Sequence, residues 1–310
     1  MIAFIFPGQG SQKVGMGKAL ADAFAVCRDT FAEADEALGV PLGRLCFEGP
    51  AEDLTLTEHT QPAILAVSTA VARLLGSRGV EPAWTAGHSL GEYSAHVAAG
   101  TFGFGDALRI VRQRGRFMQE AVPVGQGAMA AVLGADAETV ARACAEAAEG
   151  EVVSPANLNA PGQVVIAGAA AAVARAGERA RALGARRVVP LPVSAPFHCA
   201  LMQPAQARLA PLLRGLAAQD PRIPVVANVD AEPKRDRSSA IEALVRQVSA
   251  PVRWDGVVKR LASEGVRTYV EVGPGTVLAG LVKKIDRDAT VVSVEDPAGV
   301  EALDAVLSHA

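Results

Sequence analysis

Hydrophobic residues recur along this chain in two periods, one suited to strands and one suited to helices. Short apolar runs such as IAFIF near the N-terminus and TVVSV near the C-terminus are typical of buried strands. The longer stretch TQPAILAVSTAVARLL has apolar residues at helical spacing, and its Pro62 suits the first turn of a helix. Because strands and helices alternate, the pattern predicts an α/β domain with a parallel sheet.

The pattern predicts further elements on both sides of the chain's middle. Helices are expected over residues 16–38 and 61–75, then a strand over PAWTAG and helices over EYSAHVAAG and DALRIVRQRGRFMQEAV. Towards the C-terminus the order is a strand over PVVANV, helices over AIEALVRQVS and WDGVVKRLASEG, a strand over TYVEV, a helix over VLAGLVKKI and the final strand TVVSV. Both halves therefore belong to one sheet domain.

A segment with a different order interrupts this alternation. GAMAAVLG predicts a strand, AETVARACAEAA a helix, VVSPANLNA and QVVIAGA two strands joined by a Pro-Gly turn, AAVARAGERARALG a helix and ARRVVPLPV a strand. This β-α-β-β-α-β order is the ferredoxin-like unit. We therefore expect a discontinuous core over 1–123 and 194–310, and a ferredoxin-like insert over 124–193.

Composition narrows the class of protein. Of 310 residues, half are hydrophobic and 20% are charged, which is typical of a globular protein. The net charge of −3 argues against nucleic acid as a partner. The N-terminus lacks the features of a signal peptide, and no apolar run reaches transmembrane length, so we expect a cytoplasmic protein with no membrane contact. Four cysteines without metal spacing predict free thiols and no metal site: Cys27, Cys46, Cys144 and Cys199.

The stretch GHSLGEYSAH, residues 87–96, fits the pattern G-x-S-x-G. In that pattern the glycines permit a sharp strand-to-helix turn, and Ser89 stands at the N-terminus of the helix. Free N–H groups there favour a developing oxyanion. The pattern alone also fits a plain glycine-rich turn, but a predicted strand before it and a predicted helix after it favour a nucleophile.

Several histidines compete for the role of base to Ser89. His88 is adjacent, and neighbouring side chains on such a turn diverge, whereas His96 is two helical turns away. His198, in VSAPFHCALMQPA, follows a predicted strand and opens a helix where the chain returns from the insert. Chain order in this kind of fold favours His198 over the alternative of a core histidine. The histidines without a supporting context are His59 and His309.

No acidic residue suits the third position of a catalytic triad. Asp106 and Asp136 lie between Ser89 and His198, but neither follows a core strand. A backbone carbonyl can orient the histidine instead and adds no negative charge.

Two other stretches carry candidate chemistry. FPGQGSQ places Gln9 in a glycine loop at the carboxyl edge of the sheet, where it can help to bind an oxyanion; a structural turn or a phosphate loop is the alternative. In RQRGRF, Arg112, Arg114 and Arg116 alternate, so they cannot share one helix face. At least one is expected to point inward and to need an anionic partner, unless all three are solvated.

These motifs resemble those of a known family. FPGQGSQ, GHSLGEYSA, RGRFMQEAVPVGQGAMAAVLG, NAPGQVVIAG, FHCALMQPA and EVGPGTVLAGL occur in the order found in malonyl-CoA:acyl carrier protein transacylases of bacterial fatty acid synthesis and in related polyketide acyltransferase domains. The resemblance spans nearly the whole chain. It implies an α/β-hydrolase-like parallel-sheet core with an inserted ferredoxin-like (βαββαβ) subdomain.

The resemblance also implies a role for individual residues. Ser89 matches the nucleophile, His198 the general base and Arg114 the arginine that binds the free carboxylate of malonate. The remaining matches are Gln9 and the Leu90 N–H in the oxyanion hole, the main-chain carbonyl of Gln247 as the group that orients the histidine, and Asn157, Asn159, Phe197 and Met118 along the substrate cleft. Phe197 departs from the serine of many discrete members; it supports malonyl over methylmalonyl and adds slight weight to the alternative of a polyketide pathway.

The implied reaction is ping-pong transfer of malonyl from malonyl-CoA, through a malonyl-serine, to the phosphopantetheine thiol of acyl carrier protein. It needs no cofactor, and we expect a monomer. The carrier is acidic, so its docking candidates are basic: Arg186, Arg187, Lys283 and Lys284. The alternative for each of them is a solvated surface charge. The alternatives are a malonyl acyltransferase of polyketide synthesis or malonate decarboxylation, a serine esterase or thioesterase, and a non-catalytic carrier-binding scaffold.

Overall fold

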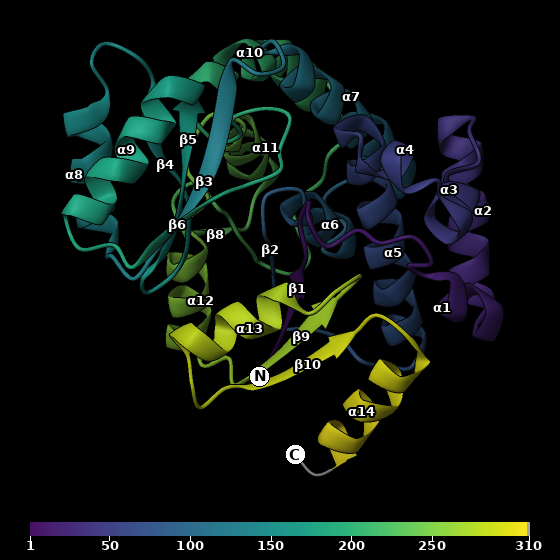
Figure 1. The fold of residues 1–310 in the computed structure, drawn as a ribbon. Coiled ribbons are helices and arrows are strands. Elements are labelled where there is room, and N and C mark those ends of the chain that lie inside the picture. The colour runs from purple at the N-terminus through teal and green to yellow at the C-terminus, as the bar shows by residue number, and fades with distance from the viewer. Residues whose placement is uncertain (309–310) are drawn as a thin grey trace.

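A six-stranded sheet forms the centre of the molecule in the computed structural model, which describes residues 1–308 (Figure 1). The strand order is β10-β9-β1-β2-β7-β8. Every pairing in it is parallel except that of β7 with β8, which is antiparallel. The strands are β1 (Ile2–Phe6), β2 (Trp84–Gly87), β7 (Val225–Val226), β8 (Pro233–Lys234), β9 (Thr268–Val272) and β10 (Thr290–Val294). The predicted parallel sheet is confirmed, and the short edge strand β8 was not predicted.

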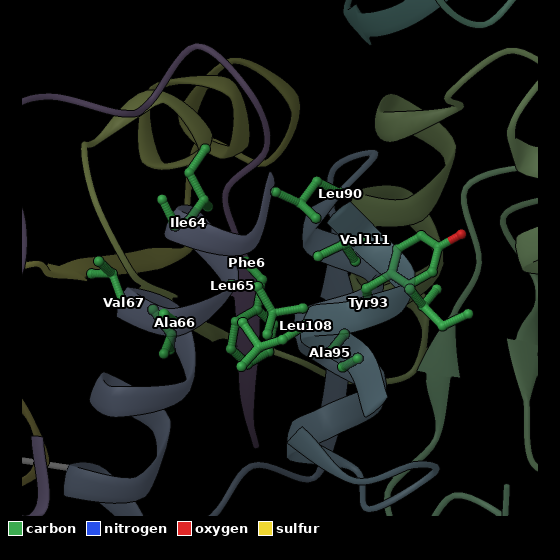
Figure 2. Packing of buried hydrophobic residues seen from close by; sticks show 14 of the residues in the cluster. Phe6, Ile64, Leu65, Ala66, Val67, Leu90, Tyr93, Ala95, Leu108 and Val111 are labelled. Atoms are coloured by element: carbon green, nitrogen blue, oxygen red, sulfur yellow. The ribbon is translucent and has the colours of Figure 1, made fainter. Parts of the chain in front are cut away.

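Helices cover both faces of this sheet because successive side chains of a strand point to opposite sides. Phe4 and Phe6 of β1 pack with α5 (Thr57–Ser77), α6 (Gly91–Ala98) and α7 (Phe104–Glu120). Figure 2 shows Phe6 within this apolar cluster, beside residues of α5, α6 and α7. On the other face, Ala3 and Ile5 pack with α12 (Trp254–Ser263) and α13 (Val277–Ile285). The expected short strand IAFIF is therefore buried on both sides.

The N-terminal helices differ from the prediction. The expected helix over 16–38 is two helices, α1 (Lys18–Ala23) and α2 (Ala25–Leu38), because Phe24 is extended, with φ −128° and ψ 123°. Two short helices, α3 (Leu42–Glu48) and α4 (Ala51–Thr55), were not predicted.

Pro62 was also misplaced, since α5 begins at Thr57 and Pro62 lies inside it. The helix begins early because the N–H and the hydroxyl of Thr60 both find acceptors, the carbonyls of Leu56 and Leu54. The missing N–H of Pro62 then costs one helical hydrogen bond.

The insert folds as an antiparallel sheet with helices packed on it, at the upper left of Figure 1. Its elements are β3 (Gly127–Leu133), α8 (Ala137–Ala147), β4 (Val153–Ala160), β5 (Gln163–Ala169), α9 (Ala170–Ala182) and β6 (Arg187–Pro190), and its strand order is β4-β5-β3-β6. Apolar residues of α8 and α9 pack with those of the sheet in a separate core. The predicted β-α-β-β-α-β order is confirmed, whereas the limits 124 and 193 stay a prediction.

The remaining helices are the short η1 (Ala200–Met202), α10 (Gln203–Arg214), α11 (Arg237–Gln247) and α14 (Pro297–Ser308). The sequence pattern did not predict α14, which buries Val300 and Leu303 in the core beside β10. Within residues 1–308, none of the helices is both long enough and apolar enough to cross a membrane. His309 lies outside the described residues.

Candidate active site

Ser89 stands at a sharp turn between β2 and α6. Its φ is 53°, an uncommon value for a residue with a side chain. A Cβ atom at Gly87 would lie 2.0 Å from the carbonyl carbon of Gly91, and one at Gly91 would lie 2.0 Å from the carbonyl oxygen of Phe6. Only glycine fits at these two positions, so the turn that presents Ser89 follows directly from the sequence.

His198 lies beside this serine, in the turn between β6 and η1. Its Nε2 is 2.7 Å from the Oγ of Ser89, and its Nδ1 is 3.0 Å from the main-chain oxygen of Gln247. Because a carbonyl only accepts, Nδ1 carries the proton, and Nε2 is left to accept from the serine hydroxyl. The structure thus brings together residues that are 109 positions apart, and a backbone oxygen takes the place of a triad carboxylate.

The environment keeps His198 neutral. Its side chain is 3% exposed. Burial, followed by the nearby positive charge of Arg114, lowers the pKa of His198 to about 3. At neutral pH the imidazole is therefore unprotonated, as a general base must be.

Arg114 is the inward-pointing arginine of the predicted set and is 1% exposed. Its Nη1 donates to Gln61 Oε1 at 2.9 Å, and its Nη2 donates to Gln247 Oε1 at 2.9 Å and to Ser89 Oγ at 3.2 Å. All of these acceptors are neutral. The expected anionic partner is therefore not found in direct contact within residues 1–308.

The surroundings of Arg114 leave it ready for an anion. Its Nε has no hydrogen-bond partner within the described chain, and its guanidinium carbon lies 5.4 Å from the centre of the Tyr93 ring. A buried guanidinium gains most from a carboxylate, which accepts two parallel hydrogen bonds. Arg112 is half-buried, and Arg116 is exposed and paired with Glu120 at 2.7 Å, so neither reaches this place.

Sequence reasoning missed two polar residues behind the turn. Asn228 Oδ1 accepts the N–H of Ser89 at 2.7 Å, and Asn228 Nδ2 donates to the carbonyl of Gly87 at 2.7 Å. Glu92 Oε2 accepts the N–H of Asn228 at 2.9 Å and Nε2 of Gln247 at 2.8 Å. Burial raises the pKa of Glu92 to about 7. A signal was available, because both are polar residues in apolar surroundings, one near the end of PVVANV and one in the first turn of α6.

The proposed oxyanion donors lie at the same edge of the sheet. A Cβ atom at Gly8 would lie 2.4 Å from the His88 carbonyl oxygen, so the loop that carries Gln9 packs directly on the turn. The Gln9 side chain is exposed and donates to Thr57 Oγ1 at 3.4 Å. The Leu90 N–H has no protein acceptor within residues 1–308, as an oxyanion donor requires.

Of the residues expected along the substrate cleft, the two asparagines lie beside His88 and Val252, and Met118 lies beside Gln61. Asn159 Oδ1 is 2.9 Å from Nε2 of His88, and Asn157 pairs through its backbone with Val252. Met118 is buried, with its sulfur 3.9 Å from Nε2 of the Gln61 that binds Arg114.

Phe197 is buried and directly precedes His198. It belongs to the main apolar core, to which Met118 also belongs.

The other described histidines have partners of their own. His88 is engaged by Asn159, as stated above. His96 is buried, its Nδ1 is 3.0 Å from Thr101 Oγ1, and burial lowers its pKa to about 3. His59 lies 2.9 Å from the carbonyl of Asp53. His198 is therefore the one that the described structure pairs with Ser89.

Three of the four basic residues expected to dock the carrier protein line one cleft of about 520 Å³ between the insert and α13. Arg186, Arg187 and Lys284 belong to it, and Lys284 Nζ also donates to Gln163 Oε1 at 2.9 Å. Lys283 instead donates to the carbonyl of Ala289. Across residues 1–308, no three His, Cys, Asp or Glu side chains are grouped so as to hold a metal ion.

Comparison with known proteins shows the family to which the chain is similar. The sequence profile described as "Acyl transferase domain" matches residues 3–301. The malonyl CoA-acyl carrier protein transacylase of Escherichia coli (strain K12) is 52% identical over 301 residues, which is 97% of each chain. That of Bacillus subtilis (strain 168) is 49% identical, over 97% of this chain and 95% of its own.

Solved structures agree closely with this fold. An acyl carrier protein S-malonyltransferase from Vibrio cholerae has a TM-score of 0.96 and 51% identity, and the match covers 97% of this chain and 99% of that one. A malonyl-transacylase in complex with its type II PKS acyl-carrier protein has a TM-score of 0.96 and 49% identity, over 98% and 99% of the two chains.

Proposed function

The chain belongs to the acyl transferase domain family, and from this premise we propose that it transfers malonyl from malonyl-CoA to acyl carrier protein through Ser89. One observation carries the proposal. The Ser89 hydroxyl lies 2.7 Å from a neutral histidine and 3.2 Å from a buried Arg114 whose described acceptors are all neutral. A serine hydrolase needs only the histidine, whereas a cation beside the nucleophile suits an acyl group with a free carboxylate.

The first half-reaction is acylation of Ser89. His198 Nε2 takes the hydroxyl proton while Oγ attacks the thioester carbonyl, and the oxyanion is bound by N–H groups of the Leu90 and Gln9 region. Each such donor is worth about 3 kcal/mol of barrier. The tetrahedral intermediate then expels the CoA thiolate, which receives the proton from His198. The products are malonyl-serine and free CoA-SH.

The second half-reaction reverses these steps with another thiol. His198 takes the proton of the phosphopantetheine thiol on the carrier, the thiolate attacks the serine ester, and Ser89 leaves as its hydroxyl after regaining that proton. The sequence of two half-reactions through one acyl-enzyme is ping-pong.

Arg114 holds the acyl group between the two steps. Its guanidinium binds the malonyl carboxylate in a bidentate pair, which selects dicarboxylic acyl groups and keeps the ester in place. A neutral carbonyl behind His198 leaves the imidazole a weaker base towards water than a carboxylate would, which disfavours hydrolysis.

The remaining predicted residues shape the acyl pocket. Asn157, Asn159 and Met118 line its sides, and the bulk of Phe197 disfavours an α-methyl branch on the acyl group. Acyl transfer between a thioester and a thiol through serine needs no resident group, so we propose that the enzyme uses neither cofactor nor metal. The groups named here all come from one chain, which suits a monomer, and the substrates suit a cytoplasmic enzyme.

A second pathway has specific support. Phe197 precedes the histidine, at a position where the family resemblance implies serine in many discrete members. The malonyl-transacylase that was solved in complex with its type II PKS acyl-carrier protein is 49% identical to this chain. The same chemistry therefore suits a polyketide carrier. Transfer rates to a fatty acid carrier and to a polyketide carrier, compared under the same conditions, distinguish the two.

Intact mass spectrometry tests the proposal. The purified protein is exposed briefly to malonyl-CoA, or to acetyl-CoA, beside the variant Ser89→Ala. A malonyl adduct that requires Ser89 and disappears when carrier protein is added supports the transacylase. No adduct, or steady release of free malonate, points to a hydrolase or a scaffold.

A further inference from the structure

Gln247 bonds the base, the buried cation and the backbone of the nucleophile. Its main-chain oxygen accepts from His198 Nδ1 at 3.0 Å. Its side-chain Oε1 accepts from Arg114 Nη2 at 2.9 Å, and its Nε2 donates to the main-chain oxygen of Ser89 at 2.9 Å. The position of the guanidinium beside the serine therefore depends on which way the Gln247 amide faces.

Arg114 alone does not fix the amide. A glutamine side chain can turn over, which exchanges its oxygen and nitrogen. In the turned state, the amide N–H₂ would face the guanidinium, and two donors would oppose each other. A partner whose oxygen already accepts another N–H, placed on the nitrogen side, disfavours this state.

Glu92 is that partner. It is fully buried, and its Oε2 accepts from Gln247 Nε2 at 2.8 Å. The same oxygen accepts the N–H of Asn228 at 2.9 Å, and Asn228 in turn holds the N–H of Ser89. Glu92 Oε1 has no partner within the described chain. One carboxylate oxygen thus bonds both residues that bind the back of the serine turn, Gln247 and Asn228. Glu92 meets Ser89 only through the backbone, where its N–H donates to the Ser89 carbonyl at 3.2 Å.

We propose that Glu92 is a positioning residue which fixes the Gln247 amide, and through it holds Arg114 where the malonyl carboxylate binds. This inference rests on the proposed function, since it assigns to Glu92 the discrimination that Arg114 provides. The hydrogen bond that Glu92 accepts from Gln247 Nε2 fixes the orientation of the amide. The effect reaches the acyl group only through Gln247 and Arg114.

The test is the rate of acyl-serine formation from malonyl-CoA and from acetyl-CoA, measured by rapid-quench intact mass. Glu92→Ala should lower the malonyl rate by about 10- to 100-fold and lower the acetyl rate less, so that the malonyl/acetyl ratio falls. Glu92→Gln keeps an acceptor oxygen and should recover the malonyl rate to within about fivefold of wild type. Ser94→Ala is the matched control, because Ser94 is buried on the same helix and has no side-chain partner within the described residues.

Each outcome decides the matter. A wild-type ratio in folded Glu92→Ala overturns the proposal, and so does a Glu92→Gln variant as impaired as Glu92→Ala. If Glu92→Ala does not fold, Glu92→Asp withdraws the carboxylate by one methylene. Its ratio must fall below that of Ser94→Ala, and an unchanged ratio overturns the proposal. The wild-type protein in the same experiment tests the proposed function separately. Its malonyl adduct is expected if the function is correct, whether or not Glu92 positions Arg114.

Discussion

Arg114 donates a hydrogen bond from Nη2 to the Oγ of Ser89 at 3.2 Å, so a buried cation lies beside the nucleophile before any substrate is bound. A carboxylate that enters can replace neutral acceptors of Arg114 and satisfy its forked N–H groups better. The geometry that we propose to favour malonyl is therefore present in the free protein.

The first prediction concerns that cation. Arg114→Ala should lower the rate of acylation by malonyl-CoA about 30-fold or more, because one partner of a buried charge pair is lost. Acylation by acetyl-CoA, or hydrolysis, should rise, since the truncated side chain leaves room and no unpaired charge. Arg112→Ala, on the same helix, is the control. An unchanged malonyl/acetyl ratio in Arg114→Ala would disprove the assignment.

The second prediction concerns pH. The pKa of His198 is lowered to about 3, so this base stays neutral far below its ordinary value of 6.5. The rate of acylation by malonyl-CoA should therefore show no fall centred near pH 6.5 when pH is lowered from 8 to about 5. A single-turnover pH profile of the acylation rate checks this. A fall in that rate with a midpoint near pH 6.5 would contradict the prediction, provided that malonyl-CoA without enzyme is stable over the same range.

The same shift has a consequence for stability. The unfolded imidazole takes up a proton as pH falls through 6.5, whereas the folded one does not until about pH 3. The contribution of His198 to the free energy of unfolding is thus fully present above pH 6.5. It decreases as the pH is lowered from 6.5 to about 3.

The third prediction concerns the serine turn. Gly87→Ala places a Cβ atom 2.0 Å from backbone atoms of Gly91, a contact that no side-chain movement relieves. The variant should lose about 3 kcal/mol or more of the free energy of unfolding, as well as its activity. Gly76→Ala is the control, because a Cβ atom there, near the end of α5, meets nothing within 4 Å. Urea unfolding of both variants measures the difference, and equal midpoints would refute the steric account.

The fourth prediction concerns carrier docking at the cleft lined by Arg186, Arg187 and Lys284. The double change Arg187→Glu with Lys284→Glu should raise the KM for an acidic carrier about tenfold and leave acylation by malonyl-CoA unchanged. Lys18→Glu, on the exposed helix α1, is the matched charge reversal. If the carrier KM stays at the wild-type value, the carrier docks elsewhere.

Sequence periodicity predicted the sheet because the strands are apolar and buried on both faces, as β1 is. It failed at Phe24, where one extended residue breaks a helix whose apolar pattern continues, and at α14, which a short C-terminal stretch forms by packing against the sheet. Local pattern carries no information on such tertiary contacts.

In the candidate site, too, local features could be predicted from the sequence and contacts between distant segments could not. Gly87, Ser89 and Gly91 were predictable because the G-x-S-x-G spacing is local, although the atom that excludes a side chain at Gly91 belongs to the distant Phe6. The polar character of Asn228 and Glu92 was visible in the sequence, but their contact was not predictable. They meet only when α6 packs beside the end of β7, and no spacing in the sequence records that contact. The anionic partner expected for Arg114 is not supplied by direct contact with a side chain of residues 1–308, because amide oxygens from distant segments fill that place.

The oxygen that fixes the tautomer of His198 belongs to the backbone of Gln247. Every amino acid carries this atom, so no codon change at position 247 removes it. Alanine scanning would report only the glutamine side chain and its own hydrogen bonds, and would miss the orienting group of the base altogether. Replacing the amide that contains this carbonyl by an ester, through chemical synthesis of the segment, would weaken the acceptor and expose its contribution.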